Sequence, residues 1–327
     1  MSEPLPGRTW DGLEIALEEP IGSTVVVRRP APGGVEILVL HRAAKGHDFE
    51  GDWAWTCPAG CRQPGEAVYR AALRELGEEA GIEFAAPWAV DLSGRWAVFA
   101  LDVAEDTVID LVDPEHDRYA WLTSQQAHAR TLPGFVAVQQ TRAASVPAVP
   151  VAFRPMTDAD LGSVARWQAA PHARQWWDGA GGDEQALRLR YGPRLAGQDP
   201  TRMWVVEVDG RPVGFLQDYR VGDHPDYAAK TADPAAVGFD YLLGEPSLIG
   251  RGLGTRMIWE FCRDVLRRDY PDAAHFTASP SHRNHRSRRV LEKCGFTEGL
   301  WIDPPGTERG LGETEVVCTL DVRHWLG

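Results

Sequence analysis

Residues 60–82 read GCRQPGEAVYRAALRELGEEAGI, and this stretch decides the fold of the first half of the chain. Its spacing predicts an α-helix over residues 67–80, at about 3.6 residues per turn. The apolar positions expected to pack inward are Leu73, Leu76 and Ala80. The opposite face carries three acids, Glu75, Glu78 and Glu79. Gly81 follows directly and supplies a residue suited to end the helix.

Three carboxylates on one helix face repel one another at the (i, i+3) and (i, i+4) spacings, by a few tenths of a kcal/mol per pair. A solvated helix face normally mixes both signs of charge, so this face needs a counter-charge. A divalent cation supplies one, because carboxylates are hard oxygen ligands and Mg²⁺ commonly bridges them to substrate phosphates. The residues alone leave open a second interpretation, a surface helix with an acidic face.

The same stretch resembles the Nudix box, G-x5-E-x7-R-E-U-x-E-E-x-G-U, at every fixed position. The resemblance extends over residues 20–143 and implies hydrolysis of a nucleoside diphosphate linked to another group. It also implies that Glu66 pairs with Arg74, and that Glu78 and Glu79 are catalytic. The implied Mg²⁺ or Mn²⁺ ligands are Glu75, Glu78, Glu79 and the carbonyl of Gly60. A Nudix fold kept only as a nucleotide-binding regulatory module is the alternative.

The chain divides near residue 145. Residues 143–150 read AASVPAVP, a small, uncharged stretch broken by prolines, as expected of a linker. We therefore expect a first domain over residues 1–144, a linker over 145–150 and a second domain over 151–327. In the first half, strands and a helix alternate in an order that predicts an α/β/α sandwich. The second half predicts a different mixed sheet, so the class is α/β (α+β) in both domains.

A glycine-rich turn follows a predicted strand at residues 237–243 and leads into a predicted helix at residues 255–268. The turn, residues 249–255, reads IGRGLGT. Glycines let backbone N–H groups approach a ligand closely, and a helix N-terminus favours an anion. The turn has neither the Lys-Ser/Thr of a P-loop nor the spacing of a dinucleotide-binding fold. Further along, residues 284–296 read NHRSRRVLEKCGF, a basic helix ended by glycine.

Together these two stretches resemble the GNAT acetyltransferases, and the resemblance extends over residues 151–327. It implies that the turn cradles the diphosphate of acetyl-CoA, that Asn284 contacts the pantetheine arm, and that Arg286 or Arg289 meets the CoA phosphates. The implied cofactor-binding residues are Gly250, Arg251, Gly252, Leu253, Gly254, Thr255, Asn284 and Arg289. Ile249 stands where the family motif has Gln or Arg, which leaves the backbone amides unchanged.

Within that superfamily the chain resembles the aminoglycoside 6'-N-acetyltransferases most, through residues 175–177 (QWW), 214–219 (GFLQDY), 231–234 (TADP) and 238–240 (GFD). Asp240 is the implied base, because an ammonium group has no lone pair with which to attack a thioester. The residues expected to contact a cationic acceptor are Trp176, Trp177, Asp178, Asp226, Tyr227 and Asp233. Core packing is the alternative for the two tryptophans, and capping of a strand end is the alternative for Asp240.

Length, charge and composition limit the classes of partner that we expect for this chain. With 327 residues and a net charge of −13, the chain is expected to hold two domains and to avoid nucleic acid. The sequence has no run of about 18 apolar residues, so we expect no membrane span. Its first residues lack the pattern of a signal peptide. Five scattered cysteines favour reduced thiols in the cytoplasm. We expect a bifunctional enzyme with small-molecule substrates; the alternative is an acetyltransferase for a polyamine, siderophore or protein amine.

Overall fold

The computed structural model describes residues 7–9, 12–43, 46–177, 182–228, 233–303 and 314–327. The chain forms two compact units. The first consists of Met1–Ala148 and Arg323–Gly327, and the second of Val149–Val322. The division falls inside the stretch predicted as the linker, while the last five residues join the first unit. No helix in the described parts of the chain is long and apolar enough to cross a membrane.

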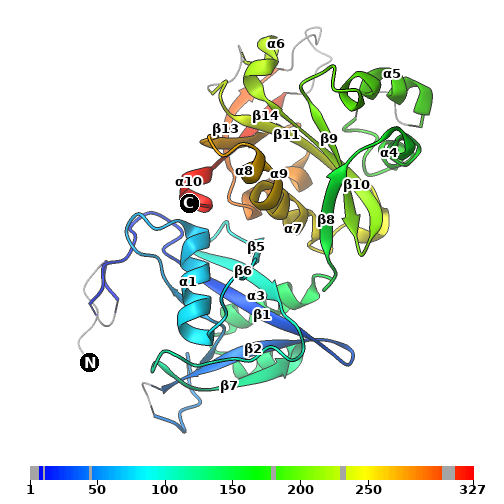
Figure 1. The fold of residues 1–327 in the computed structure, drawn as a ribbon. Coiled ribbons are helices and arrows are strands. Elements are labelled where there is room, and N and C mark those ends of the chain that lie inside the picture. The colour runs from blue at the N-terminus through cyan, green and yellow to red at the C-terminus, as the bar shows by residue number, and fades with distance from the viewer. Residues whose placement is uncertain (1–6, 10–11, 44–45, 178–181, 229–232, 304–313) are drawn as a thin grey trace. The chain divides into compact units, whose positions relative to one another are not determined.

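The first unit is built on a seven-stranded mixed sheet (Figure 1). Its strands are β1 (Gly22–Ala31), β2 (Gly34–Arg42), β3 (Trp55–Thr56), β4 (Ala59–Cys61), β5 (Trp88–Asp91), β6 (Trp96–Asp102) and β7 (His116–Thr123). Its helices are α1 (Val68–Ala80), α2 (Ser124–Arg130) and α3 (Gly134–Ser145). The order β3-β2-β1-β6-β5 forms the main path, with β4 added beside β1 and β7 beside β2. Only the β1–β6 pair is parallel among these pairings.

Strand β1 shows why this sheet is covered on both faces. Its central residues Val25, Val26 and Val27 are all buried, although successive side chains point to opposite faces. Helix α1 packs on β1 and β4, and α2 and α3 pack on β2 and its neighbours (Figure 1). The α/β/α arrangement predicted for this half of the chain is therefore confirmed.

The second unit contains a separate seven-stranded mixed sheet, with the order β13-β14-β12-β11-β10-β9-β8. Its strands are β8 (Val151–Pro155), β9 (Arg202–Val208), β10 (Arg211–Arg220), β11 (Val237–Leu243), β12 (His275–Ala278), β13 (Thr297–Ile302) and β14 (Glu315–Asp321). Its α-helices are α4 (Leu161–Ala169), α5 (Glu184–Leu195), α6 (Pro225–Ala228), α7 (Leu253–Glu260), α8 (Arg267–Asp269) and α9 (His285–Lys293); α10 (Val322–Trp325) follows β14. Two unlike mixed sheets confirm the predicted class.

Helix α7 is shorter than the predicted helix over residues 255–268. It starts at Leu253, and at Phe261–Leu266 the backbone adopts a π-helical turn before α8 begins. Helix α5 was not expected from the sequence, because Gly192 and Pro193 both disfavour a helix interior. Its buried side chains Leu187 and Tyr191 join the core between α4 and the sheet, and this packing overrides local propensity.

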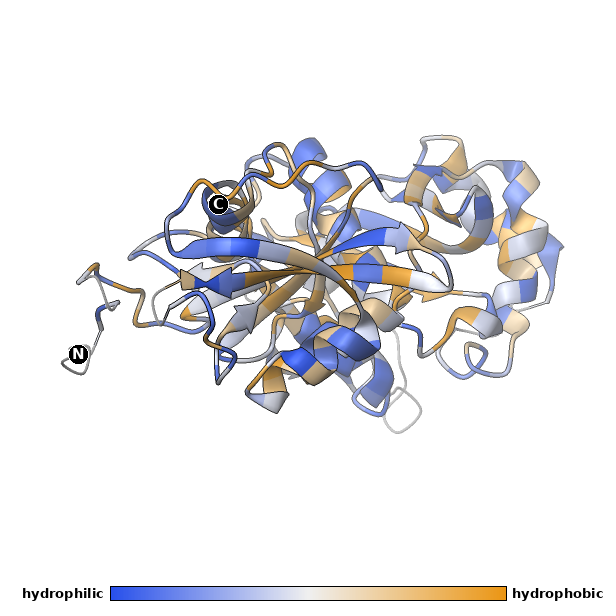
Figure 2. Cartoon of the chain, turned by 90° about the horizontal axis from the view of Figure 1, so that it is seen from below, coloured by the Kyte–Doolittle hydropathy of each residue, from blue (hydrophilic) through white to orange (hydrophobic). Residues whose placement is uncertain are grey.

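The strands β11 and β12 separate soon after they begin. They pair in parallel at two positions only, Val237 with Phe276 and Gly238 with Thr277. On its other side β11 pairs with β10 along its whole length. From Phe239 onward, the edge of β11 that faces β12 therefore has no strand partner within the described residues. Figure 2 shows hydrophobic residues along the strands, which agrees with the burial of both sheet centres.

Candidate functional site

The three acids of α1 have different surroundings. Glu75 and Glu79 are buried, whereas the Glu78 side chain is about half exposed. The Ala59 N–H donates a hydrogen bond to Glu79 Oε2 at 2.8 Å. A Cβ on Gly60 would lie 1.9 Å from Glu75 Oε1, so only glycine leaves room for that carboxylate. The alternative interpretation, a surface helix with a solvated acidic face, does not hold for Glu75 and Glu79, because the β4 segment covers them.

Arg74 holds this group of acids together. Its Nε donates to Glu66 Oε1 at 2.9 Å, as the motif implies. Its Nη1 donates to Glu75 Oε1 at 2.7 Å and to Glu78 Oε2 at 2.9 Å. Glu75 and Glu78 therefore share one guanidinium nitrogen, which provides the positive charge that the sequence pattern required.

Burial changes the protonation of the two covered acids. Desolvation raises the pKa of Glu75 from 4.5 to about 7, although Arg74 opposes this. Desolvation also raises the pKa of Glu79 well above its ordinary value, with a further contribution from the nearby Glu75 charge. Both carboxyls therefore keep a proton to a higher pH than an exposed glutamate does, unless more positive charge reaches them.

His116 is a neighbour of this site that sequence reasoning did not use. Its side chain is fully buried, its Nδ1 lies 3.9 Å from Glu79 Oε1, and neither ring nitrogen has a hydrogen-bond partner among the described residues. Desolvation, with the nearby Arg42 charge, lowers the pKa of His116 to about 4. The ring is therefore neutral near pH 7 and adds no positive charge to the acids.

The donor chemistry of α1 fits a divalent cation. Carboxylate oxygens are the ligands that Mg²⁺ and Mn²⁺ prefer. Burial raises the pKa values of Glu75 and Glu79, and a bound cation would favour their charged forms. In the described parts of the chain, no group of three or more His, Cys, Asp or Glu side chains is arranged to hold a metal. Binding would require Glu75 and Glu78 to turn from Arg74 toward the ion.

In the second unit, a run of free backbone amides precedes and begins α7. Gly250 and Gly252 have φ angles of 78° and 81°, which only glycine adopts without strain. Within the described parts of the chain, the amides of residues 250–255 have no backbone or side-chain acceptor. The first N–H that bonds within the helix is that of Arg256, to the Gly252 carbonyl. Six amides at a helix N-terminus make a suitable cradle for a diphosphate.

Two residues expected to bind the cofactor also have structural partners. The Asn284 side chain caps α9 by accepting a hydrogen bond from the Ser287 N–H at 3.1 Å. Arg289 Nη1 donates to Glu292 Oε2 at 2.6 Å on the same helix, and its side chain is about half exposed. The Cys294 thiol donates to the Thr255 carbonyl, which ties the end of α9 to the start of α7.

Asp240 lies on β11 just beyond the point where β12 separates. It faces Gln217 directly across the β10–β11 pair, and Gln217 Nε2 donates to Asp240 Oδ2 at 2.7 Å. Gln217 Oε1 in turn accepts a hydrogen bond from Arg194 Nη1 at 2.6 Å. Desolvation raises the pKa of Asp240, while Gln217 and the arginines of α5 oppose this. The sequence contained Gln217 within a recognised motif, but nothing in it signalled Arg194.

The residues expected to contact an acceptor are placed differently from one another. The Trp177 ring packs on Phe215 with centroids 4.9 Å apart, against the hydrophobic core of the second unit. Trp176 is partly buried in the same turn. Asp233 Oδ2 is hydrogen-bonded to His275 Nδ1 at 2.6 Å. Asp226 and Tyr227 lie in α6, with their side chains outside the described atoms, and Asp178 lies outside the described residues.

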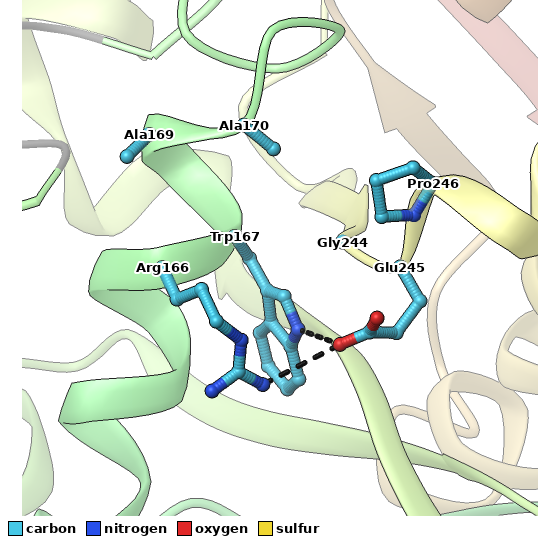
Figure 3. A pocket seen from close by; sticks show the side chains of 7 residues that line it. All are labelled: Arg166, Trp167, Ala169, Ala170, Gly244, Glu245 and Pro246. Atoms are coloured by element: carbon cyan, nitrogen blue, oxygen red, sulfur yellow. Dashed lines mark hydrogen bonds and ion pairs between the residues drawn. The ribbon is translucent and has the colours of Figure 1, made fainter.

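A surface hollow lies where α4 ends and the segment after β11 begins (Figure 3). It has a volume of about 360 Å³. The Trp167 Nε1 donates to Glu245 Oε1 at 2.9 Å, and Arg166 also points toward this carboxylate. A Cβ on Gly244 would lie 2.1 Å from Trp167 Cγ, so the indole packs directly on the backbone. This packing holds the chain just before the amide cradle.

Comparison with protein families defines the class of each unit. The NUDIX domain model matches residues 20–139, and the model of an acetyltransferase (GNAT) domain matches residues 156–303. The chain is therefore an enzyme with a Nudix hydrolase domain followed by a GNAT acetyltransferase domain.

Individual proteins are similar to this chain over part of its length. Aminoglycoside N(6')-acetyltransferase type 1 of Klebsiella pneumoniae is 31% identical over 163 residues, covering 48% of this chain and 79% of that protein. A kanamycin resistance protein of Rhizobium radiobacter is 35% identical over 75 residues, covering 23% of this chain and 68% of that protein. A crystal structure of an aminoglycoside acetyltransferase with coenzyme A has 24% identity and a TM-score of 0.47, covering 54% of this chain and 96% of that one. The chain belongs to the aminoglycoside 6'-N-acetyltransferase family.

Proposed function

We propose that the second domain transfers an acetyl group from acetyl-CoA to an amino group of an aminoglycoside-like acceptor, as a 6'-N-acetyltransferase does. Such an activity would confer antibiotic resistance. The observation that carries this proposal is the position of Asp240 on β11. Beyond Gly238 the β12-facing edge of this strand has no strand partner within the described residues, and the chain then runs to the six amides of residues 250–255. The amides of residues 250–255 would bind the diphosphate of CoA. The unpaired β11 edge would accept the extended pantetheine arm beside them.

Asp240 would act as the base. It would take a proton from the acceptor ammonium, directly or through water, so that the amine can attack the thioester carbonyl. Its raised pKa makes the carboxylate a stronger base than an exposed aspartate. Gln217 would hold one oxygen of Asp240 and leave the other for the acceptor. The Trp177 ring, packed on Phe215, would provide an apolar wall for a sugar ring.

Thiol release from acetyl-CoA tests this activity. We expect the full-length protein to release CoA with kanamycin, and Asp240→Asn to lose at least a hundredfold in kcat while still binding acetyl-CoA. Asp223→Asn removes one exposed carboxylate of the same domain and serves as the control. Failure to release thiol with any member of an aminoglycoside panel would contradict the proposed acceptor.

We also propose that the first domain hydrolyses a nucleoside diphosphate derivative with a bound divalent cation. When bound, the cation would neutralise the diphosphate and activate a water. Glu75, Glu78 and Glu79 would hold it, with the Gly60 carbonyl beside them. Glu75 and Glu78 would exchange their bonds to Arg74 for the cation, and the Ala59 N–H would orient Glu79.

The hydrolase proposal is tested by product release from a set of nucleoside diphosphate derivatives, with Mg²⁺ or Mn²⁺. We expect Glu79→Gln to abolish turnover, and Glu83→Gln, an exposed acid just after α1, to keep it. Equal rates for wild type and Glu79→Gln would show that these acids are not catalytic, and the domain would then be a binding module.

A further inference from the structure

His116 of the first domain has surroundings that do not satisfy its side chain. The side chain is fully buried, yet neither ring nitrogen has a hydrogen-bond partner within the parts of the chain that the structure describes. Buried polar atoms nearly always have such a partner, because burial without one costs the free energy of their lost hydration. The ring therefore indicates a second state of the site, in which one of its nitrogens is bonded.

The backbone directs this ring toward the acids of α1. His116 is the first residue of β7 and pairs with Arg42 of β2. The next pair along the strands is His41 with Arg118, so β7 has one residue more than β2 at this point. Such a β-bulge re-aims a side chain relative to a regular strand. With this bulge in place, His116 Nδ1 lies 3.9 Å from Glu79 Oε1.

The Glu79 carboxylate is held at one oxygen only. Its Oε2 accepts a hydrogen bond from the Ala59 N–H at 2.8 Å, whereas its Oε1 has no hydrogen-bond partner within the described residues. His116 Nδ1 is about 1 Å too far from Oε1 for a hydrogen bond. Ionised carboxylates accept shorter and stronger hydrogen bonds than neutral carboxyls do. A cation that favours the charged form of Glu79 would therefore also draw Oε1 toward the ring.

We propose that His116 is a positioning residue for Glu79, which donates a hydrogen bond from Nδ1 to Oε1 when a divalent cation is bound. The Ala59 N–H and the His116 ring would then fix both oxygens of the carboxylate. Each oxygen has two lone pairs, so each keeps one for the cation. This inference rests on the proposed cation site, and it names a residue outside α1 that determines how tightly the ion binds.

The proposed bond needs the ring proton on Nδ1, which leaves Nε2 as an acceptor. Arg42 is a donor beside the ring, since it pairs with His116 across the strands and its charge contributes to lowering the pKa of His116. Arg42 Nε is itself buried and has no hydrogen-bond partner within the described residues. A donor on this side suits an acceptor at Nε2, so the surroundings of the ring agree with the tautomer that the proposal requires.

A matched pair of variants tests the proposal. Asn and Leu have nearly the same shape, but only Asn has an N–H donor in its side chain. In calorimetric titration of the full-length protein with Mn²⁺, we expect His116→Leu to raise the dissociation constant about tenfold, and His116→Asn to stay within about threefold of wild type. A ring that merely fills space would make both variants alike. His128→Leu removes an exposed histidine of the same domain and should bind Mn²⁺ as wild type does.

Thermal unfolding with a chelator shows whether each variant is folded. A second measurement leaves His116 in place: with ¹⁵N-labelled histidine rings, Mg²⁺ should move one Nδ1-bound proton signal downfield, and Glu79→Gln should lack this change. If wild type and variants bind Mn²⁺ as expected but wild type hydrolyses no nucleoside diphosphate derivative, the proposed hydrolysis fails and the inference stands. Equal affinities of His116→Leu and His116→Asn, or histidine signals that Mg²⁺ leaves unchanged, overturn the inference. Absence of Mn²⁺ binding by wild type overturns both.

Discussion

The burial of Glu75 predicts that the first domain loses stability as the pH rises, in the absence of a divalent cation. The folded state raises the pKa of this carboxyl from 4.5 to about 7, so between these values the folded protein binds more protons than the unfolded chain. The contribution of Glu75 to the free energy of unfolding is therefore fully present below pH 4.5, and it is lost as the pH rises through about 7. The difference corresponds to about 3 kcal/mol. Glu79 changes in the same direction.

Calorimetric unfolding of the full chain with a chelator, between pH 5 and 8, measures this effect. At about 2–4 °C per kcal/mol, the wild-type transition of the first domain should fall by roughly 6–12 °C across that range. Glu75→Gln, which cannot ionise, should flatten the fall, whereas Glu83→Gln should leave it unchanged. Added Mg²⁺ should raise the wild-type transition most at pH 8. The same fall in Glu75→Gln as in wild type would refute the reasoning.

Three further substitutions test local geometry. Gly252→Ala forces a side chain onto a backbone with φ of 81°, and should cost about 1–2 kcal/mol and weaken CoA binding; unchanged CoA affinity by calorimetry would count against the amide cradle. Gly244→Ala places a Cβ 2.1 Å from Trp167 Cγ and should lower the melting temperature strongly, whereas Gly192→Ala, with open space, should not. Asp218→Asn should cost about 2–4 kcal/mol in denaturant unfolding, because the buried carboxylate accepts hydrogen bonds from three side chains (Arg202, Trp204 and Tyr270); a loss below 1 kcal/mol would contradict this.

Much of the fold could be predicted because its signals are local. Strand β11 has the predicted bounds, since an apolar run carries that information within a few residues. Helix α1 ends at Gly81, which has a φ of 65° and donates to the Gly77 carbonyl. Helix α5 was missed because tertiary packing of Tyr191, and not its own sequence, stabilises it.

The geometry of the candidate sites could be predicted less well, because it depends on contacts between segments that are distant in the sequence. The sequence predicted which acids α1 carries, but not that β4 buries two of them, since burial depends on a strand that precedes the helix and packs across it. Asp240 was predicted through its motif, whereas the contact of Arg194 with Gln217, which links it to Asp240 from a distant helix, was not. A contact of this kind has no signature in spacing along the chain.

Arg74 has a consequence for how the first domain would exchange its ion. Because one guanidinium contacts Glu66, Glu75 and Glu78 together, these carboxylates already have a positive neighbour before a cation arrives. An arriving ion would therefore replace an internal charge instead of filling a vacancy. Removing it with a chelator should leave the helix folded, so that loading and release can proceed without any unfolding step.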